Sequence, residues 1–390
     1  MGRNVRPRTA TEPSRASIVD VARRAGVSVA TVSRALRGLP NVSPDTRERV
    51  LAAALELEYT ASPLAAALVT GRTRSVGVIA ADADSWFFAE VLRGIEEGLR
   101  DCGYDLVLHV LPEGARRQQF FAVLPVRRRV DALVVAGLRL TAAELLRLNQ
   151  LQLPMVGVGE PLAGVHTERI DNEAAARMAT QHLIDLGHTR IAMVGGSPDG
   201  DPLSAPAARA RGFRAALAAA GLTPAAVLDG RFTSAGGAVA GAALVALAGG
   251  PPSAVFCQSD EMAFGVLQAL QRAGLRVPGQ VSVIGFDDHE LAGAFELTTV
   301  GQPIAAQGAA AARWLTARLD QVTQLGGPDL PGLTAPDLPA PDLLAPAANG
   351  SADGNGSAAC EEPAGAETLH LVRLVQRGST APPAGISAAS

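Results

Sequence analysis

From Ser75 to about residue 325, short apolar segments alternate with amphipathic helical segments, and this alternation constrains the fold more than any other feature. The apolar segments fit buried strands, so the pattern predicts parallel sheets covered by helices, an α/β fold. The alternation is long enough for two such units. We expect strands at 75–81, 106–111, 132–136, 155–158, 191–194, 254–257, 281–286 and 368–375, and helices at 88–101, 208–220 and 261–273.

The N-terminal part has a different pattern, with short helical segments close together. Ser17 followed three residues later by Asp20 is a capping-box signature, and the apolar spacing after it predicts a helix that ends at Gly26. Ser28 can cap a second helix over residues 29–36. Two short helices joined by a tight glycine turn are typical of the helix-turn-helix motif, whose second helix enters the major groove of DNA.

A third helix is expected to begin after Ser43, because a proline and an acidic residue follow this capping serine. Its apolar positions Val50, Ala54 and Leu57 would close a small core against the first two helices. The same pattern also fits a three-helix bundle without any role in DNA binding.

The charge distribution favours the DNA-binding interpretation. Residues 1–75 hold 12 arginines and six acidic residues, a net charge of +6, whereas the remainder holds 22 arginines and 32 acidic residues, a net charge of −10. A basic head on an acidic body is typical of a nucleic-acid-binding domain joined to a domain that does not bind phosphate.

Composition completes the predicted organisation. Residues 1–16 carry arginines without an apolar pattern, and residues 326–366 are rich in Pro, Ala, Gly, Leu and Asp with no arginine, so we expect both to be disordered. The predicted parts are an arm at 1–16, a helix-turn-helix headpiece at 17–60, a connector at 61–74, a two-lobed domain at 75–325 and 367–382, and an insertion at 326–366.

The headpiece resembles that of the LacI/GalR family of bacterial repressors over the segment IVDVARRAGVSVATVSRALRGLPNVSPDTRERVLAAALELEY. The resemblance extends to about Pro382 and is interrupted only by the insertion. It implies a homodimeric, cytoplasmic transcriptional regulator, a repressor of carbohydrate-utilisation genes, that is not an enzyme and needs no cofactor. Two headpieces would read a pseudo-palindromic operator, and a small effector, expected to be a sugar, would change the affinity for it.

The resemblance assigns DNA contacts to the second helix and its surroundings. Arg34 can make a bidentate contact to guanine, whereas Val29 and Ala30 offer apolar contacts to a thymine methyl group. The hydroxyls of Thr31 and Ser33 suit phosphate contacts. The full set of expected DNA-binding residues is Ser17, Ser28, Val29, Ala30, Thr31, Ser33, Arg34, Arg47 and Leu68.

Leu68 belongs to the connector, which resembles the family's hinge helix. In the family this segment folds on DNA binding and pushes a leucine into the minor groove, where it unstacks a base step. The connector departs from the family pattern, because Ala66 stands where an arginine is frequent and Ser62 where an asparagine is common. These departures put the strength of minor-groove binding in doubt.

The two-lobed domain resembles periplasmic sugar-binding proteins, which bind ligand between their lobes at the carboxyl ends of the strands. Polar groups there would bind paired hydroxyls, and aromatic rings would cover apolar sugar faces. The expected effector-binding residues are Asp82, Phe87, Phe88, Arg209, Ser259, Asp260 and Asp287. Ser259 replaces a usual asparagine, Gly159 a frequent aspartate and Trp86 a usual proline, which leaves a less polar effector open.

Other functions fit the sequence less well. His182 and His188 lie six residues apart without a third ligand nearby, and the three cysteines show no CxxC spacing, so no metal site is expected. No GxSxG motif and no complete nucleotide-binding glycine motif is present. A periplasmic sugar-binding protein would need an export signal, and we expect neither a signal peptide nor a membrane span. A purine- or nucleoside-sensing repressor of the same family remains an open alternative.

Overall fold

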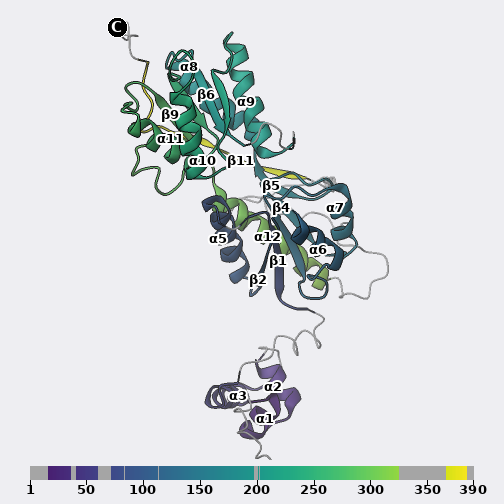
Figure 1. The fold of residues 1–390 in the computed structure, drawn as a ribbon. Helices are drawn as coiled ribbons and strands as arrows, with labels where there is room; N and C mark the ends of the chain where they lie inside the picture. The colour runs from purple at the N-terminus through teal and green to yellow at the C-terminus, as the bar shows by residue number, and fades with distance from the viewer. Residues whose placement is uncertain are drawn as a thin grey trace, which may run out of the picture. The chain divides into compact units, whose positions relative to one another are not determined.

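The computed structural model describes residues 16–36, 41–59, 72–82, 84–112, 114–196, 201, 203–324 and 366–383. The chain divides into two compact units, Met1–Thr73 and Arg74–Ser390 (Figure 1). Within the described ranges, no helix is long and apolar enough to cross a membrane. The expected disorder of 1–16 and 326–366 falls on ranges that lie almost wholly outside the described residues, as does most of the connector.

The first unit contains the three predicted helices, α1 (Ile18–Ala25), α2 (Val29–Leu36) and α3 (Pro44–Glu56). The capping box of α1 is present, because the Ser17 hydroxyl accepts the backbone N–H of Asp20 and the Asp20 carboxylate accepts the N–H of Ser17 at 3.0 Å. Gly26 ends α1 in the left-handed conformation, with φ 67°. The small core holds one fully buried valine from each helix, namely Val21, Val32 and Val50.

The first lobe of the second unit is built on a six-stranded parallel sheet in the order β11-β5-β4-β3-β1-β2. Its strands are β1 (Ser75–Ala80), β2 (Asp105–Val110), β3 (Ala132–Ala136), β4 (Met155–Val158), β5 (Thr167–Ile170) and β11 (Glu367–His370). One face is covered by α5 (Trp86–Arg100) and α12 (Ile304–Gln324), and the other by α6 (Ala115–Val123) and α7 (Ala142–Asn149) (Figure 1). Helices α5 and α12 approach so closely that a Cβ at Gly94 would lie 1.9 Å from the carbonyl oxygen of Ala305.

The second lobe repeats this architecture with the strand order β12-β10-β9-β8-β6-β7. Its strands are β6 (Ile191–Gly195), β7 (Ala226–Asp229), β8 (Ala254–Cys257), β9 (Ser282–Asp287), β10 (Thr298–Gly301) and β12 (Arg373–Val375), of which only β12 is antiparallel. One face is covered by α8 (Asn172–Asp185) and α9 (Ala205–Ala219), and the other by α10 (Ser234–Val245) and α11 (Asp260–Arg272). The expected pair of doubly wound lobes is therefore confirmed.

The chain passes between the lobes three times, after β5, after β10 and after β11. The third passage shows that the single strand predicted over 368–375 is wrong. The segment forms two short strands in different sheets, with β11 paired to β5 and β12 paired to β10. Leu371 between them is 90% exposed, whereas Val372 packs against the core of the second lobe. Apolar residues here mark a change of lobe rather than one continuous strand.

Candidate functional site

The outer face of α2 presents the residues that the sequence assigned to DNA. Val29 is 41% exposed, and Ala30 and Arg34 are also exposed, while Thr31 and Ser33 are half-buried. A guanidinium, two hydroxyls and small apolar groups are therefore carried by one rigid helix, which is the arrangement that a major groove accepts.

The start of α2 is fixed by a local hydrogen bond. The Ser28 Oγ accepts the backbone N–H of Thr31 at 3.1 Å and lies 2.9 Å from its hydroxyl oxygen. Because Ser28 and Ser17 both satisfy the free N–H groups of a helix start, each has a structural role beside its expected DNA contact.

Two polar contacts join α1 to α3, the helices against which α2 packs. Arg24 of α1 forms an ion pair with Glu56 of α3 at 2.7 Å, and the Arg49 guanidinium donates to the carbonyl oxygen of Ala25 at 2.6 Å. Arg47 is half-buried on α3. The proposed minor-groove residue, Leu68, lies outside the described residues.

The first lobe contributes aromatic rings to the candidate site between the lobes, which we call the interlobe site. Phe87 and Phe88, in the first turn of α5, pack edge to face with ring centroids 5.3 Å apart. They lie against two glycines that follow β3 and β4, because a Cβ at Gly137 would lie 2.6 Å from the Phe88 ring and one at Gly159 would lie 3.7 Å from Phe87. Asp82 follows β1 and accepts the N–H of Asp84 at 2.9 Å.

The second lobe contributes a buried cation and a buried acid. Arg209, on α9, donates to Asn172 at 2.9 Å and to the carbonyl oxygen of Gln258 at 2.5 Å, and its guanidinium carbon lies 3.7 Å from the centroid of the Phe286 ring. Its Nη1 lies 4.0 Å from the Oδ1 of Asp287. These contacts fix the planar guanidinium in one orientation.

Asp287, the last residue of β9, has a strained backbone conformation and a buried carboxyl group. Its φ of 113° is a conformation that non-glycine residues rarely adopt, and such strain is concentrated at functional sites. Burial raises the pKa of its carboxyl group to about 6, although Arg209 and a 2.6 Å hydrogen bond from Gln302 act in the opposite direction. A strained, buried carboxylate at the carboxyl end of a parallel strand is a strong candidate for binding a polar ligand.

Two other predicted residues are already engaged within the protein. The Asp260 carboxylate accepts the Thr299 hydroxyl at 2.7 Å and the N–H of His289 at 2.8 Å, and burial together with the charge of Asp287 raises its pKa to about 8. The Ser259 hydroxyl caps α11 by accepting the N–H of Met262 at 3.2 Å. Across the described residues, no group of three or more His, Cys, Asp and Glu side chains could hold a metal ion.

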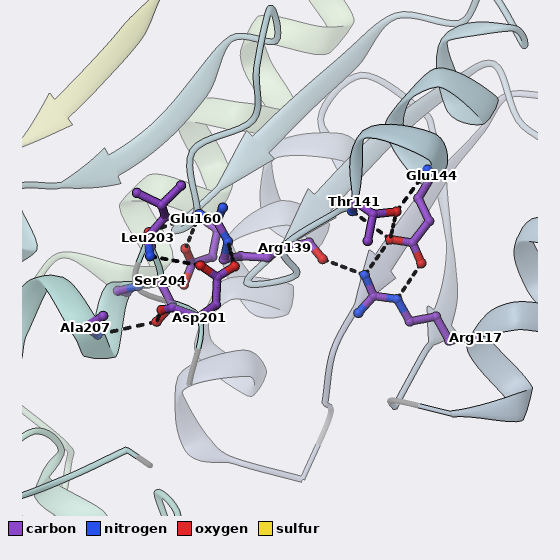
Figure 2. Close-up of polar contacts among 10 residues, drawn as sticks. Arg117, Arg139, Thr141, Glu144, Glu160, Asp201, Leu203, Ser204 and Ala207 are labelled. Carbon is purple, nitrogen blue, oxygen red and sulfur yellow. Dashed lines mark hydrogen bonds and ion pairs between the residues drawn. The ribbon is translucent and has the colours of Figure 1, made fainter. Parts of the chain in front are cut away.

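Sequence reasoning missed a polar network that joins the lobes. Arg139 of the first lobe donates to the carbonyl oxygen of Leu203 at 3.0 Å and forms an ion pair with Asp201, and both partners belong to the turn before α9 (Figure 2). Glu160, two residues after β4, accepts the N–H of Ala205 at 2.9 Å. Each residue is a lone charge in a loop, and only the fold brings the loops together. The available signal was a charged residue shortly after a buried strand.

Aromatic side chains also connect the lobes. Trp86, at the start of α5, lies with its ring centroid 4.5 Å from that of His289, which follows β9. The backbone N–H of Trp86 donates to Glu261 of α11, whose pKa is raised by burial and by the nearby charge of Asp82. The first turn of α5, which carries Phe87 and Phe88, is thereby tied to the second lobe.

Comparisons with known proteins agree with this architecture. Residues 17–62 match the model of bacterial regulatory proteins of the lacI family, and residues 180–332 match that of the periplasmic binding protein-like domain. The HTH-type transcriptional repressor CytR of Escherichia coli K12 is 36% identical over 294 residues, which cover 74% of this chain and 85% of CytR.

Solved structures share this architecture. A Lac repressor dimer bound to operator and an anti-inducer superposes with a TM-score of 0.73 at 23% identity, covering 94% of this chain and 99% of that one. The transcriptional regulator CelR in complex with cellobiose has a TM-score of 0.62 at 29% identity and covers 94% of this chain and 100% of that one. The chain is thus a DNA-binding transcriptional regulator that belongs to the lacI family of bacterial regulatory proteins.

Proposed function

We propose that this protein is an effector-responsive repressor of carbohydrate-utilisation genes, which acts in the cytoplasm as a homodimer on a pseudo-palindromic operator. The observation that carries the effector part is the buried ion pair between Arg209 of α9 and Asp287 at the end of β9, in the lobe other than the one that carries Phe87 and Phe88. The neighbouring regulator that binds cellobiose supports a sugar as the ligand class.

On the DNA side, we assign base contacts to Arg34, Val29 and Ala30, and phosphate contacts to Thr31 and Ser33. Arg47, Ser17 and Ser28 would support the same surface, and Leu68 would enter the minor groove. The dimer would place two such helices one helical turn of DNA apart, and its two-fold symmetry would be mirrored in a pseudo-palindromic operator.

On the effector side, the Asp287 carboxylate would accept hydrogen bonds from two hydroxyls while Arg209 donates to a third oxygen. Phe87 and Phe88 would cover an apolar face of the ligand, with Asp82 beside them. Asp260 and Ser259 would act by holding the Asp287 loop and the start of α11. Because the ligand would contact both lobes, binding would change their relative arrangement and hence the affinity for DNA.

A nucleoside or purine is the second candidate ligand. Three consecutive aromatic residues, Trp86, Phe87 and Phe88, begin α5, and a glycine occupies position 159. Such a surface suits the flat face of a base as well as a sugar ring.

The proposal is tested in two steps with the full-length protein. Selection from a library of random DNA duplexes should yield a pseudo-palindromic site, and a melting-temperature screen with sugars and nucleosides should find a stabilising ligand, since a ligand at 100 times its Kd adds about 2.7 kcal/mol. The ligand should then change the affinity for the selected duplex. A ligand that binds tightly and leaves DNA affinity unchanged would contradict the proposal.

A further inference from the structure

One oxygen of the Glu160 carboxylate, Oε2, has only a 4.0 Å ion-pair contact to the Nη1 of Arg139. The Glu160 side chain is only 10% exposed, and its Oε1 accepts the N–H of Ala205, at the first residue of α9. Its Oε2 is buried and accepts no hydrogen bond from the described residues. Most buried polar atoms in proteins are hydrogen-bonded, so a buried carboxylate oxygen without a hydrogen bond calls for an explanation.

The neighbouring cations are committed to other partners. The Arg139 guanidinium contacts Asp201 and the carbonyl oxygen of Leu203, and its Nη1 lies 4.0 Å from the Glu160 Oε2, beyond hydrogen-bond distance (Figure 2). Arg209, whose charge also acts on Glu160, donates to Asn172 and Gln258. Oε2 therefore receives no hydrogen bond from either arginine, although the charges of both act on Glu160 against that of Asp201.

The surroundings of Glu160 place this oxygen at the interlobe site. The preceding residue, Gly159, lies against the Phe87 ring, and Ala205 begins the helix that carries Arg209. With only 10% of its side chain exposed, Glu160 has lost much of its hydration, and this burial raises its pKa. A hydrogen-bond donor on a bound ligand would replace the hydration that the Glu160 Oε2 loses through burial.

We propose that Glu160 is a further effector-binding residue, whose Oε2 accepts a hydrogen bond from a hydroxyl or amino group of the effector. This inference rests on the proposed function and adds a specificity determinant from the first lobe. Because Oε1 contacts the start of α9, the same carboxylate would connect the ligand to the helix that carries Arg209. Ligands that lack a donor at this position would be discriminated against.

The test is calorimetry on the full-length protein with cellobiose, glucose, ribose, adenosine and cytidine, followed by the monodeoxy analogues of each compound that binds. Glu160→Gln keeps the shape and the acceptor for Ala205 but removes the charge. We expect it to weaken binding of the parent compound about tenfold, which corresponds to about 1.4 kcal/mol. One monodeoxy analogue, lacking the hydroxyl that faces Glu160, should bind the wild type and the variant equally well.

Glu144→Gln is the matched control. Glu144 is a carboxylate of the same lobe, paired with Arg117 at 2.7 Å and part of the capping box of α7, away from Glu160 (Figure 2). This variant should leave ligand affinity unchanged. Glu160→Asp, which keeps the charge and shortens the reach, is the second variant should Glu160→Gln fail to fold, and it should show the same pattern across the deoxy series.

The outcomes separate the two proposals. Equal affinity of the wild type and the Glu160 variants for every parent compound would overturn the role of Glu160 and leave the effector-responsive function standing. If no compound binds the wild type, the proposed sugar or nucleoside response falls, and the inference falls with it.

Discussion

The headpiece and the interlobe site hold their candidate functional residues in opposite ways. Arg34 and Ala30 are exposed on α2, and the valines that support this helix are buried behind it. Arg209 and Asp287 are themselves buried and bonded to the protein around them. A surface that reads a large duplex must present its side chains outward, whereas a site that encloses a small molecule must take its polar groups out of water and satisfy them internally.

This difference has a consequence for mutations. Truncating an exposed, DNA-contacting side chain should remove DNA binding and leave folding intact, because no other part of the protein packs on that side chain. Truncating a buried polar residue should affect both, because its partners remain buried without it. The predictions that follow challenge this contrast, beginning with the largest expected effect.

Arg209→Ala should lower the free energy of unfolding of the second unit by about 3–5 kcal/mol, the cost of leaving a buried partner without its opposite charge. Urea unfolding followed by tryptophan fluorescence measures this unit selectively, because both tryptophans, Trp86 and Trp314, belong to it. A loss of less than 1 kcal/mol would show that the buried arginine is not a structural element and would break the contrast.

Asp287→Asn should remove a pH dependence of stability. The folded protein holds a proton on Asp287 up to about pH 6, whereas the unfolded chain releases it near 3.8, so the wild type loses stability as the pH rises through this window. The difference corresponds to roughly 3 kcal/mol. Unfolding free energies of the two proteins should therefore diverge in favour of the variant between pH 4 and pH 7.

The control for this titration is Asp105→Asn, which changes an exposed carboxylate on β2. Its unfolding free energy should follow that of the wild type across the same pH range. Parallel curves for the wild type and Asp287→Asn would show that the carboxyl group of Asp287 does not titrate in this window.

Ser17→Ala should have the smallest effect on stability, about 1 kcal/mol, because it removes one half of the capping box of α1. Amide hydrogen exchange over residues 17–59, read by mass spectrometry, should become faster, while exchange in the second unit stays unchanged. Faster exchange in both units would mean that the headpiece and the body do not unfold independently.

Much of this structure could be predicted from the sequence because local patterns determine it. The capping serines, Gly26 and the strand-helix alternation each act over a few residues, so periodicity and turn chemistry were sufficient. Strand β5, with a glutamate and an arginine among its four residues, shows no such pattern and was missed. The break after β11 was also missed, because pairing with distant strands decides it.

The interlobe site shows the same limit. Asp287 and Arg209 were found through a resemblance, whereas Arg139 and Glu160 became visible only when the loops after β3 and β4 met the turn before α9. Neither residue lies in a motif. The conformation of Asp287 could not be predicted either, since a positive φ at an aspartate reflects tertiary contacts rather than local preference.

The most direct test of this account is a fluorescence-anisotropy titration of the selected duplex and a scrambled duplex with three proteins: the wild type, Arg34→Ala and Asp287→Asn. Arg34→Ala should lose about 1–3 kcal/mol on the selected duplex and little on the scrambled one, with unchanged unfolding, because a bidentate base contact is lost. Asp287→Asn should keep DNA selectivity and no longer respond to the ligand that binds the wild type. An equal loss of affinity by Arg34→Ala on both duplexes, or a wild-type ligand response in Asp287→Asn, would contradict the assignment of DNA reading to α2 and of effector sensing to the interlobe site.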